Sequence, residues 1–231
     1  MKEQDTNKKE VIKKNDFIEL EFTGYSEGKV FDSNIEEDLK QVSKDAKPQK
    51  SIIIVSQKMV VPGLDKAIEG KEIGKEYNID LSYEEGFGAR KRELVKTIPL
   101  KVFTQQKINP SPGATLMLDN HLAKIITISG ARVVTDFNNP LSGKPISYKF
   151  KIKRKVTESK EKAESFFTNF MRFVPKLEEE KDKIILKGPK ILEQVIETFK
   201  PKFKELVGLD LGFKEEAIKE NPPKEKQDKK D

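Results

Sequence analysis

Apolar and polar positions alternate in the first well-patterned stretch of the chain, FIELEF at residues 17–22. A period of two is typical of a half-buried strand, so this stretch predicts a strand that ends at Gly24. SIIIVS at 51–56 is a short apolar run rich in β-branched residues, which favours a buried strand. EYNIDL at 76–81 alternates again and predicts a further strand. The polar residues 35–50 have weak helical spacing and are expected to form a flap.

A short helix is predicted between the second and third of these strands. The Pro62–Gly63 pair ends extended structure, and Leu64, Ala67 and Ile68 then recur at the spacing of one helix face. Gly70 is expected to end the helix, because glycine readily adopts the left-handed conformation found after helix ends. The first part of the chain therefore predicts strands wrapped round one short helix.

Three strand-length runs occupy residues 93–136, namely ATLMLD, AKIITISG and ARVVTDF, and each is closed by glycine, asparagine or aspartate. They predict a small antiparallel β-unit. Directly afterwards, residues 146–153 alternate apolar side chains with serine and lysine and predict one long strand. No strand-like run follows it until about residue 180, so this strand is expected to pair with one earlier in the chain.

Helical periodicity dominates residues 157–220, where a strand-like run separates two helical stretches and a short strand follows. The order predicts an α-β-α-β unit, with Pro201 breaking or kinking the second helix. The phenylalanines at 166, 170 and 173 share one helix face and are expected to form core or a dimer interface. Residues 1–14 and 221–231 are charge runs without periodicity and are predicted to be disordered tails.

Composition narrows the chemistry that the chain can perform. The 231 residues include no cysteine and one histidine, His121, which excludes disulfides, thiol catalysis and multi-histidine metal sites. No metal or other cofactor is expected. No apolar run approaches the roughly 20 residues of a membrane span, and the N-terminus lacks a signal-like apolar region, so a cytoplasmic protein without a membrane partner is expected.

The charge balance leaves a second interpretation open. A net charge of +6 is compatible with a ribosome or nucleic-acid partner, although 39 acidic residues are interleaved with 45 basic ones. Interleaved charges are more typical of a solvated surface than of a nucleic-acid footprint. A basic ribosome-associated factor therefore stays as an alternative function.

Several motifs between residues 17 and 153 carry a family resemblance. They are FTGYSEGKVFDSN, VVPGLDKAIEGKEIGKEYNI, GFG, IPLKVF and VVTDFNNPLSGKPISYKFKI. In this order and spacing they resemble the FK506-binding-protein (FKBP) type of peptidyl-prolyl cis/trans isomerase, in its SlyD-like branch. The resemblance implies an α+β fold in which an antiparallel sheet half-wraps a short helix, with an inserted small β domain and a C-terminal α/β domain.

The resemblance also implies a division of the chain into domains. Residues 15–92 and 137–155 would form the isomerase domain, and residues 93–136 would form the insert-in-flap domain, which binds unfolded chains in relatives. Residues 157–220 look like the C-terminal α/β extension of long archaeal members, which can mediate dimerisation. The implied partners are unfolded or proline-containing polypeptides and a second copy of the chain.

The family pattern implies a substrate pocket. Leu64 would form its floor, the backbone N–H of Val61 would bind a substrate carbonyl, and Asp32 would present a carboxylate at the rim. The full set of residues carried over from the motifs is Phe22, Phe31, Asp32, Val60, Val61, Leu64, Phe87 and Tyr148.

Two positions depart from the family pattern. Phe22 and Phe87 stand where most members have tyrosine, so two hydroxyl groups are missing and weaker catalysis is expected. The main functional hypothesis is thus a folding catalyst that binds the twisted X-Pro amide, joined to a chaperone insert. A holdase chaperone with weak or no isomerase activity is the alternative that these two phenylalanines suggest.

Overall fold

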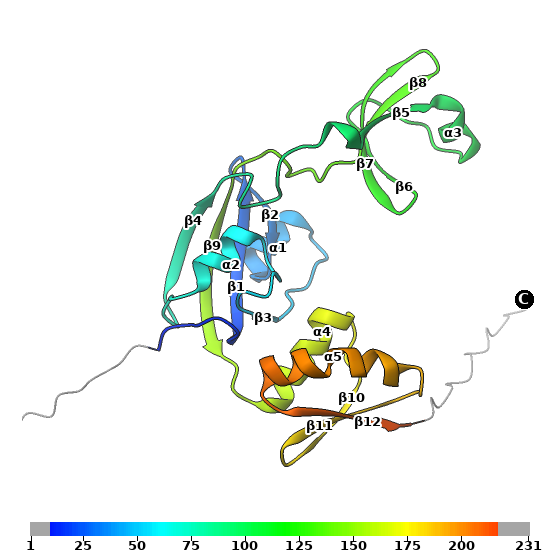
Figure 1. Ribbon diagram of the computed structural model, residues 1–231. Coiled ribbons are helices and arrows are strands. Elements are labelled where there is room, and N and C mark those ends of the chain that lie inside the picture. The colour runs from blue at the N-terminus through cyan, green and yellow to red at the C-terminus, as the bar shows by residue number, and fades with distance from the viewer. Residues whose placement is uncertain (1–9, 217–231) are drawn as a thin grey trace, which may run out of the picture.

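The computed structural model describes residues 10–216, which form three bodies along the chain (Figure 1). The central body contains β1 to β4, β9 and two helices, and the β5–β8 body lies at one end of it. The C-terminal body consists of α4, α5 and the sheet β10 to β12. Mixed helices and mainly antiparallel sheets make this an α+β fold. No helix within residues 10–216 is long and apolar enough to span a bilayer.

Antiparallel pairing builds the sheet of the central body, with strand order β2-β1-β9-β4. Strand β3 pairs with residues 17–20 of β1, on the same edge of β1 as β2 and opposite β9. Its long C-terminal strand β9 lies between β1 and β4, which confirms that this strand pairs with earlier ones. The predicted flap region contains a helix, α1. The elements are β1 (Phe17–Ser26), β2 (Lys29–Ser33), α1 (Glu36–Val42), β3 (Ser51–Ile54), α2 (Pro62–Ile68), β4 (Glu76–Leu81) and β9 (Ile146–Lys155).

The short helix α2 packs on the central sheet through Leu64 and Ile68, which are both buried. Gly63 permits this approach, because a Cβ atom there would lie 2.5 Å from a methyl carbon of Leu81. Gly70 has a φ of +78° after the helix, a conformation that glycine adopts without strain. The predicted helix and its end are confirmed.

A separate four-stranded sheet of order β5-β8-β7-β6 forms the β5–β8 body. The sequence patterns predicted β6, β7 and β8 but missed β5 and α3. Both are short, Pro99 lies between them, and neither shows a clear period of apolar residues. Its core consists of Phe103, Leu118, Ala123, Ile125 and Val133. The elements are the 3₁₀ turn η1 (Arg92–Leu94), β5 (Val95–Pro99), α3 (Leu100–Gln105), β6 (Thr115–Leu118), β7 (His121–Ser129) and β8 (Arg132–Asp136).

The C-terminal body has the order α-β-β-α-β, so the α-β-α-β prediction was wrong by one strand. The missed strand, β10, reads KLEEE and is too charged to show alternation. Helix α5 continues through Pro201 without a break, because buried residues on its last two turns hold it to the core. The elements are α4 (Ser159–Met171), β10 (Lys176–Glu180), β11 (Lys183–Gly188), α5 (Leu192–Val207) and β12 (Asp210–Glu215).

Residues 10–14 were predicted to belong to a disordered tail, but they contact the central body. The side chain of Ile12 is only 1% exposed, and its N–H donates to the carbonyl of Lys71 at 3.0 Å. Val11 forms an isolated β-bridge with Glu72. The tail prediction was therefore wrong for residues 10–14, and its remainder, like that for 221–231, lies outside the described residues.

Candidate functional site

Four aromatic rings meet on one side of the central body. Phe31 of β2 contacts Phe87 edge to face, with ring centroids 5.7 Å apart, and contacts Tyr148 of β9 at the same distance. Phe22 of β1 contacts Tyr148 at 6.1 Å. We call these four residues the aromatic cluster. Edge-to-face rings stabilise one another beyond the apolar area that they bury.

Gly24 is the residue that lets two of these rings approach the sheet. It lies directly opposite Tyr148 in the pairing of β1 with β9. A Cβ atom at Gly24 would lie 2.6 Å from the ring of Phe31 and 2.9 Å from the ring of Tyr148. The sequence analysis used Gly24 only as the end of a strand, whereas β1 continues past it to Ser26. Its missing side chain is what places the cluster.

The other predicted apolar residues lie beside the aromatic cluster, at the start of α2. Leu64 is fully buried, whereas Val60 and Val61 are half-buried and pack against the same core. Val61 is the N-cap residue of α2, with extended backbone angles. Within the described residues its N–H has no hydrogen-bond acceptor, so a backbone donor is available next to Leu64.

Asp65 holds the loop that leads to these valines, and the sequence analysis missed it. Its buried carboxylate accepts hydrogen bonds from the N–H of Ser56 at 2.7 Å and from that of Lys58 at 2.9 Å. Both loop residues have positive φ, near +60°, which non-glycine residues rarely adopt. The carboxylate thus stabilises an unfavourable loop conformation just before Val60. An acidic residue within an otherwise apolar helix face was the available signal.

Asp32 adds the only carboxylate of the predicted set, on β2 next to Phe31. Partial burial raises the pKa of its carboxyl, although a hydrogen bond from the backbone of Ser33 opposes the shift. Burial raises the pKa of Tyr148 to about 12, and the negative charge of Asp32 contributes to that shift. At neutral pH, Tyr148 is therefore a neutral phenol that can donate a hydrogen bond.

Phe87 is positioned by the segment that returns from the β5–β8 body. The hydroxyl of Ser142 donates to the carbonyl of Phe87 at 3.2 Å, and the N–H of Gly143 donates to Gly88 at 2.8 Å. A further bond, from Gly63 N–H to the carbonyl of Glu85 at 2.8 Å, ties the same loop to α2. The wall formed by Phe87 therefore depends on contacts from two directions.

The seven apolar residues of the predicted set pack together in one core, and the charge of Asp32 acts on Tyr148 at its edge. The arrangement suits recognition of a small apolar group beside a free backbone donor. It contains no nucleophile activated by a base. Whether these residues bind and turn a substrate stays a prediction.

Comparison with known proteins gives the family. A family model described as "FKBP26, IF domain" matches residues 96–141. A protein of Methanocaldococcus jannaschii named short-type peptidyl-prolyl cis-trans isomerase is 30% identical over 147 residues, which cover 62% of this chain and 93% of that protein. The chain belongs to the FKBP-type peptidyl-prolyl cis-trans isomerases.

Bacterial relatives specify the kind of FKBP-type isomerase. Two proteins named FKBP-type peptidyl-prolyl cis-trans isomerase SlyD are similar to this chain. The one from Haemophilus influenzae is 33% identical over 93 residues, 38% of this chain and 48% of the relative. The one from Helicobacter pylori is 28% identical over 146 residues, 62% of this chain and 73% of the relative. The chain is thus an FKBP-type isomerase of the SlyD-like kind.

A cleft of about 550 Å³ lies where the β5–β8 body of this FKBP-type isomerase joins the central body. Leu122 and Ile126 of β7 contribute exposed apolar side chains to its lining. Arg90 and Asp136 line the same cleft and form an ion pair at 2.6 Å. Ser142, which holds Phe87, is also in the lining, so the cleft and the aromatic cluster share one connecting segment.

Proposed function

We propose that this chain catalyses cis–trans isomerisation of X-Pro bonds in polypeptides, at the aromatic cluster. The observation that carries the proposal is the placement of the unbonded N–H of Val61 beside the buried Leu64 and the four rings. A proline ring would pack against the aromatic side chains. The residue before it would be held through its carbonyl by the Val61 N–H.

The site lowers a barrier that arises from amide resonance. Rotation about the peptide bond costs about 18–20 kcal/mol, because the twisted amide loses its partial double bond. No covalent step is needed, so a site that binds the twisted form more tightly than the planar forms accelerates the reaction. The twisted amide is less dipolar than the planar one, and an apolar surface therefore favours it.

Polar groups at the edge of the cluster would orient the substrate. Asp32 would accept hydrogen bonds at the rim. Tyr148 would supply a hydroxyl in a site where Phe22 and Phe87 supply none. Within the described residues, the Tyr148 hydroxyl has no protein hydrogen-bond partner, which leaves it free to bind a substrate carbonyl.

The β5–β8 body would be the insert-in-flap domain that binds unfolded clients. Three apolar side chains on β6 and β7 are exposed: Met117 at 59%, Leu122 at 47% and Ile126 at 41%. Two of them line the cleft at the joint with the central body. A client held there would present its prolines to the aromatic cluster at a raised local concentration.

These assignments give the chain three proposed domains. Residues 15–92 and 137–155 form the isomerase domain, residues 93–136 the insert and residues 157–220 the C-terminal α/β domain. The ribosome-associated alternative gains no support from the surface of β9, where Lys149 pairs with Glu76 and Lys153 with Glu21. Paired lysines leave less positive charge for a nucleic acid.

A protease-coupled assay with a short proline peptide tests the catalytic proposal. We expect acceleration by the purified chain, a loss of roughly tenfold in kcat/KM for Phe87→Ala and a smaller loss for Tyr148→Phe, since one neutral hydrogen bond contributes about 0.5–1.5 kcal/mol. The matched control is Tyr83→Phe, which removes an exposed phenol outside the cluster. Suppression of client aggregation without any peptide isomerisation would select the holdase alternative instead.

A further inference from the structure

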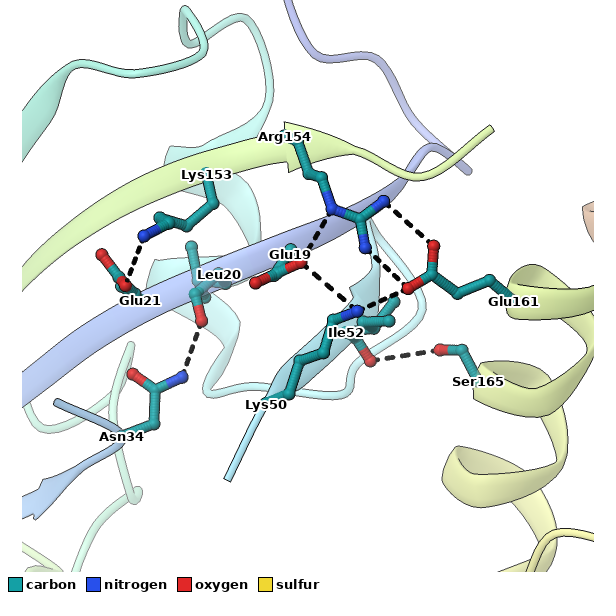
Figure 2. A network of polar contacts seen from close by, with 10 residues as sticks. All are labelled: Glu19, Leu20, Glu21, Asn34, Lys50, Ile52, Lys153, Arg154, Glu161 and Ser165. Carbon is teal, nitrogen blue, oxygen red and sulfur yellow. Dashed lines mark hydrogen bonds and ion pairs between the residues drawn. The ribbon is translucent and has the colours of Figure 1, made fainter. Parts of the chain in front are cut away.

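Helix α4 of the C-terminal body is joined to the central body by a network of charged side chains (Figure 2). The guanidinium of Arg154 donates to both carboxylate oxygens of Glu161 at 2.6 and 2.9 Å and to Glu19 at 2.8 Å. Lys50 lies between the same two carboxylates, 2.5 Å from Glu161 and 3.5 Å from Glu19. Four separate segments of the chain therefore meet at one point.

A shared apolar core lies behind this network. Phe17, Ile54 and Val156 of the central body pack in one buried cluster with Phe166 and Phe167 of α4. All five side chains are fully buried. The C-terminal body is thus continuous with the central body, and its position relative to β3 is fixed.

The same helix also occupies the open edge of β3. Among residues 10–216, strand β3 pairs only with β1, so the backbone groups on its other side need partners. The carbonyl of Ile52 accepts hydrogen bonds from Asn169 at 3.0 Å and from the hydroxyl of Ser165 at 3.3 Å, the latter shown in Figure 2. On the same edge, the N–H of Ile54 donates to the sulfur of Met59 at 3.3 Å.

Met59 connects the edge of β3 with the candidate site. Its side chain packs against both the core shared with α4 and the core that contains Leu64. The next two residues are Val60 and Val61, whose backbone and side chains form one wall of the proposed pocket. Two hydrogen bonds and the backbone of β3 therefore connect Asn169 through Ile52 and Ile54 to Met59, which is two residues before Val61.

We propose that Asn169 and Met59 are positioning residues of the isomerase site, through which helix α4 fixes the Val60–Val61 wall. The inference rests on the proposed function, because it assigns α4 a role in the same reaction. Loss of the Asn169 contact would leave the longer Ser165 bond as the remaining contact from α4 to the Ile52 carbonyl, which would loosen the edge of β3 and let Met59 shift. The Val61 N–H would then lie out of line with the substrate carbonyl. Binding of the transition state would therefore weaken more than the stability of the folded chain.

Two variants of α4 distinguish a role in positioning Val60 and Val61 from a role only in attaching the C-terminal body to the central body. Asn169→Ala removes the hydrogen bond to Ile52, whereas Glu161→Gln weakens the charged network and leaves the path to Met59 intact. In the full-length chain we expect Asn169→Ala to lower peptide kcat/KM about three- to tenfold, the equivalent of roughly one neutral hydrogen bond. Glu161→Gln is expected to lower stability with kcat/KM within about twofold of the parent. Thr168→Ala, on the exposed side of α4, controls for the effect of a substitution in this helix.

Amide resonances give a readout that does not depend on activity. We expect the ¹H–¹⁵N signals of Val60 and Val61 to shift in Asn169→Ala and to stay in place in Thr168→Ala. Unchanged signals together with parental kcat/KM would overturn the inference, even if Asn169→Ala unfolds at a lower temperature. A parent chain that is inactive would instead contradict the proposed function, and the resonances would still test the contact path.

Met59→Leu provides a second test if Asn169→Ala does not fold. Leucine keeps the apolar volume but removes the sulfur that accepts the Ile54 N–H. The inference expects the same direction of change in kcat/KM and in the two valine signals. A Met59→Leu chain with parental values for both would contradict it.

Discussion

The β5–β8 body and the C-terminal body are attached to the central body in opposite ways. The β5–β8 body has a core made only of its own residues and meets the central body through two chain segments. The C-terminal body shares a core with β1 and β3 and adds a charged network and hydrogen bonds to an edge strand. A body with its own core can change position without disturbing the sheet, whereas a body with a shared core cannot.

This difference matches the roles proposed for the two bodies. A client-binding module works best when it can bring many different segments to one site, and attachment through two segments permits that. A pocket wall needs a fixed position, because misplacement by about 1 Å can reduce catalysis considerably. Under the proposed function, the β5–β8 body would be a loosely joined module for capture and the C-terminal body a tightly joined one for positioning.

Removing one buried ring from each body should give the largest contrast. Phe166 of α4 and Phe103 of α3 are both fully buried, and loss of such a ring costs about 3–5 kcal/mol. We expect Phe166→Ala to reduce amide protection from hydrogen exchange in α4 and in β3 together. Phe103→Ala should reduce protection only within residues 95–136. Equal loss of protection in β3 for both variants would contradict the comparison.

Substitution of the exposed apolar residues of the cleft should affect catalysis on protein substrates and on short peptides differently. The double variant Leu122→Ser, Ile126→Ser removes the apolar side of the cleft without touching a core. We expect catalysis of a proline-limited protein refolding reaction to fall roughly tenfold, since tethered binding raises local concentration, while short-peptide kcat/KM stays at the parental value. Ile191→Ser, which changes an exposed apolar residue of the C-terminal body, is the matched control. Equal losses for the two variants would leave the β5–β8 body without a special role.

The sequence predicted the central body better than either attachment. Alternation and β-branched runs located β1, β3, β4 and β9, because one face of each strand is buried in a local pattern. The seven apolar site residues came from motif resemblance, and they do pack together. Gly24 and Asp65 were missed as site determinants, since their importance arises from contacts with Phe31 and Tyr148 and with the loop before α2. The periodicity of apolar residues within one segment does not indicate which residues of other segments they contact.

Sequence patterns also could not predict how the C-terminal body is attached, because that attachment depends on contacts between separate segments. Arg154 and Glu161 are seven residues apart, but Glu19 and Lys50 come from distant parts of the chain. Each is one of many charged residues in a chain rich in lysine and glutamate. Only the pairing of β1 with β3 and β9 brings them together, and no local signal distinguishes them from solvated charges.

Acid should weaken the C-terminal attachment through Glu161. Hydrogen bonds from Arg154 and Lys50 lower the pKa of its carboxyl to about 2, from about 4.5 in a free side chain. Its contribution to stability is therefore complete above pH 4.5 and is lost as the pH falls towards 2. We expect Glu161→Gln to lower the free energy of unfolding by about 1 kcal/mol at pH 7 and to flatten its acid dependence. Urea unfolding between pH 7 and pH 3 measures both effects.

Asp136→Asn should give the smallest change, at the joint of the β5–β8 body. Partial burial opposes ionisation of Asp136, but hydrogen bonds from Asn138 and Arg90 lower the pKa of its carboxyl. Its stabilising effect is thus present at neutral pH and is lost in acid, the same sign as for Glu161. Arg90 is half-exposed, and such pairs contribute less than about 1 kcal/mol. We expect the global free energy of urea unfolding at pH 7 to change by less than about 0.5 kcal/mol, with protection in β3 unchanged. An effect as large as that of Glu161→Gln would mean that the two bodies are attached with similar strength, and the proposed division between capture and positioning would fail.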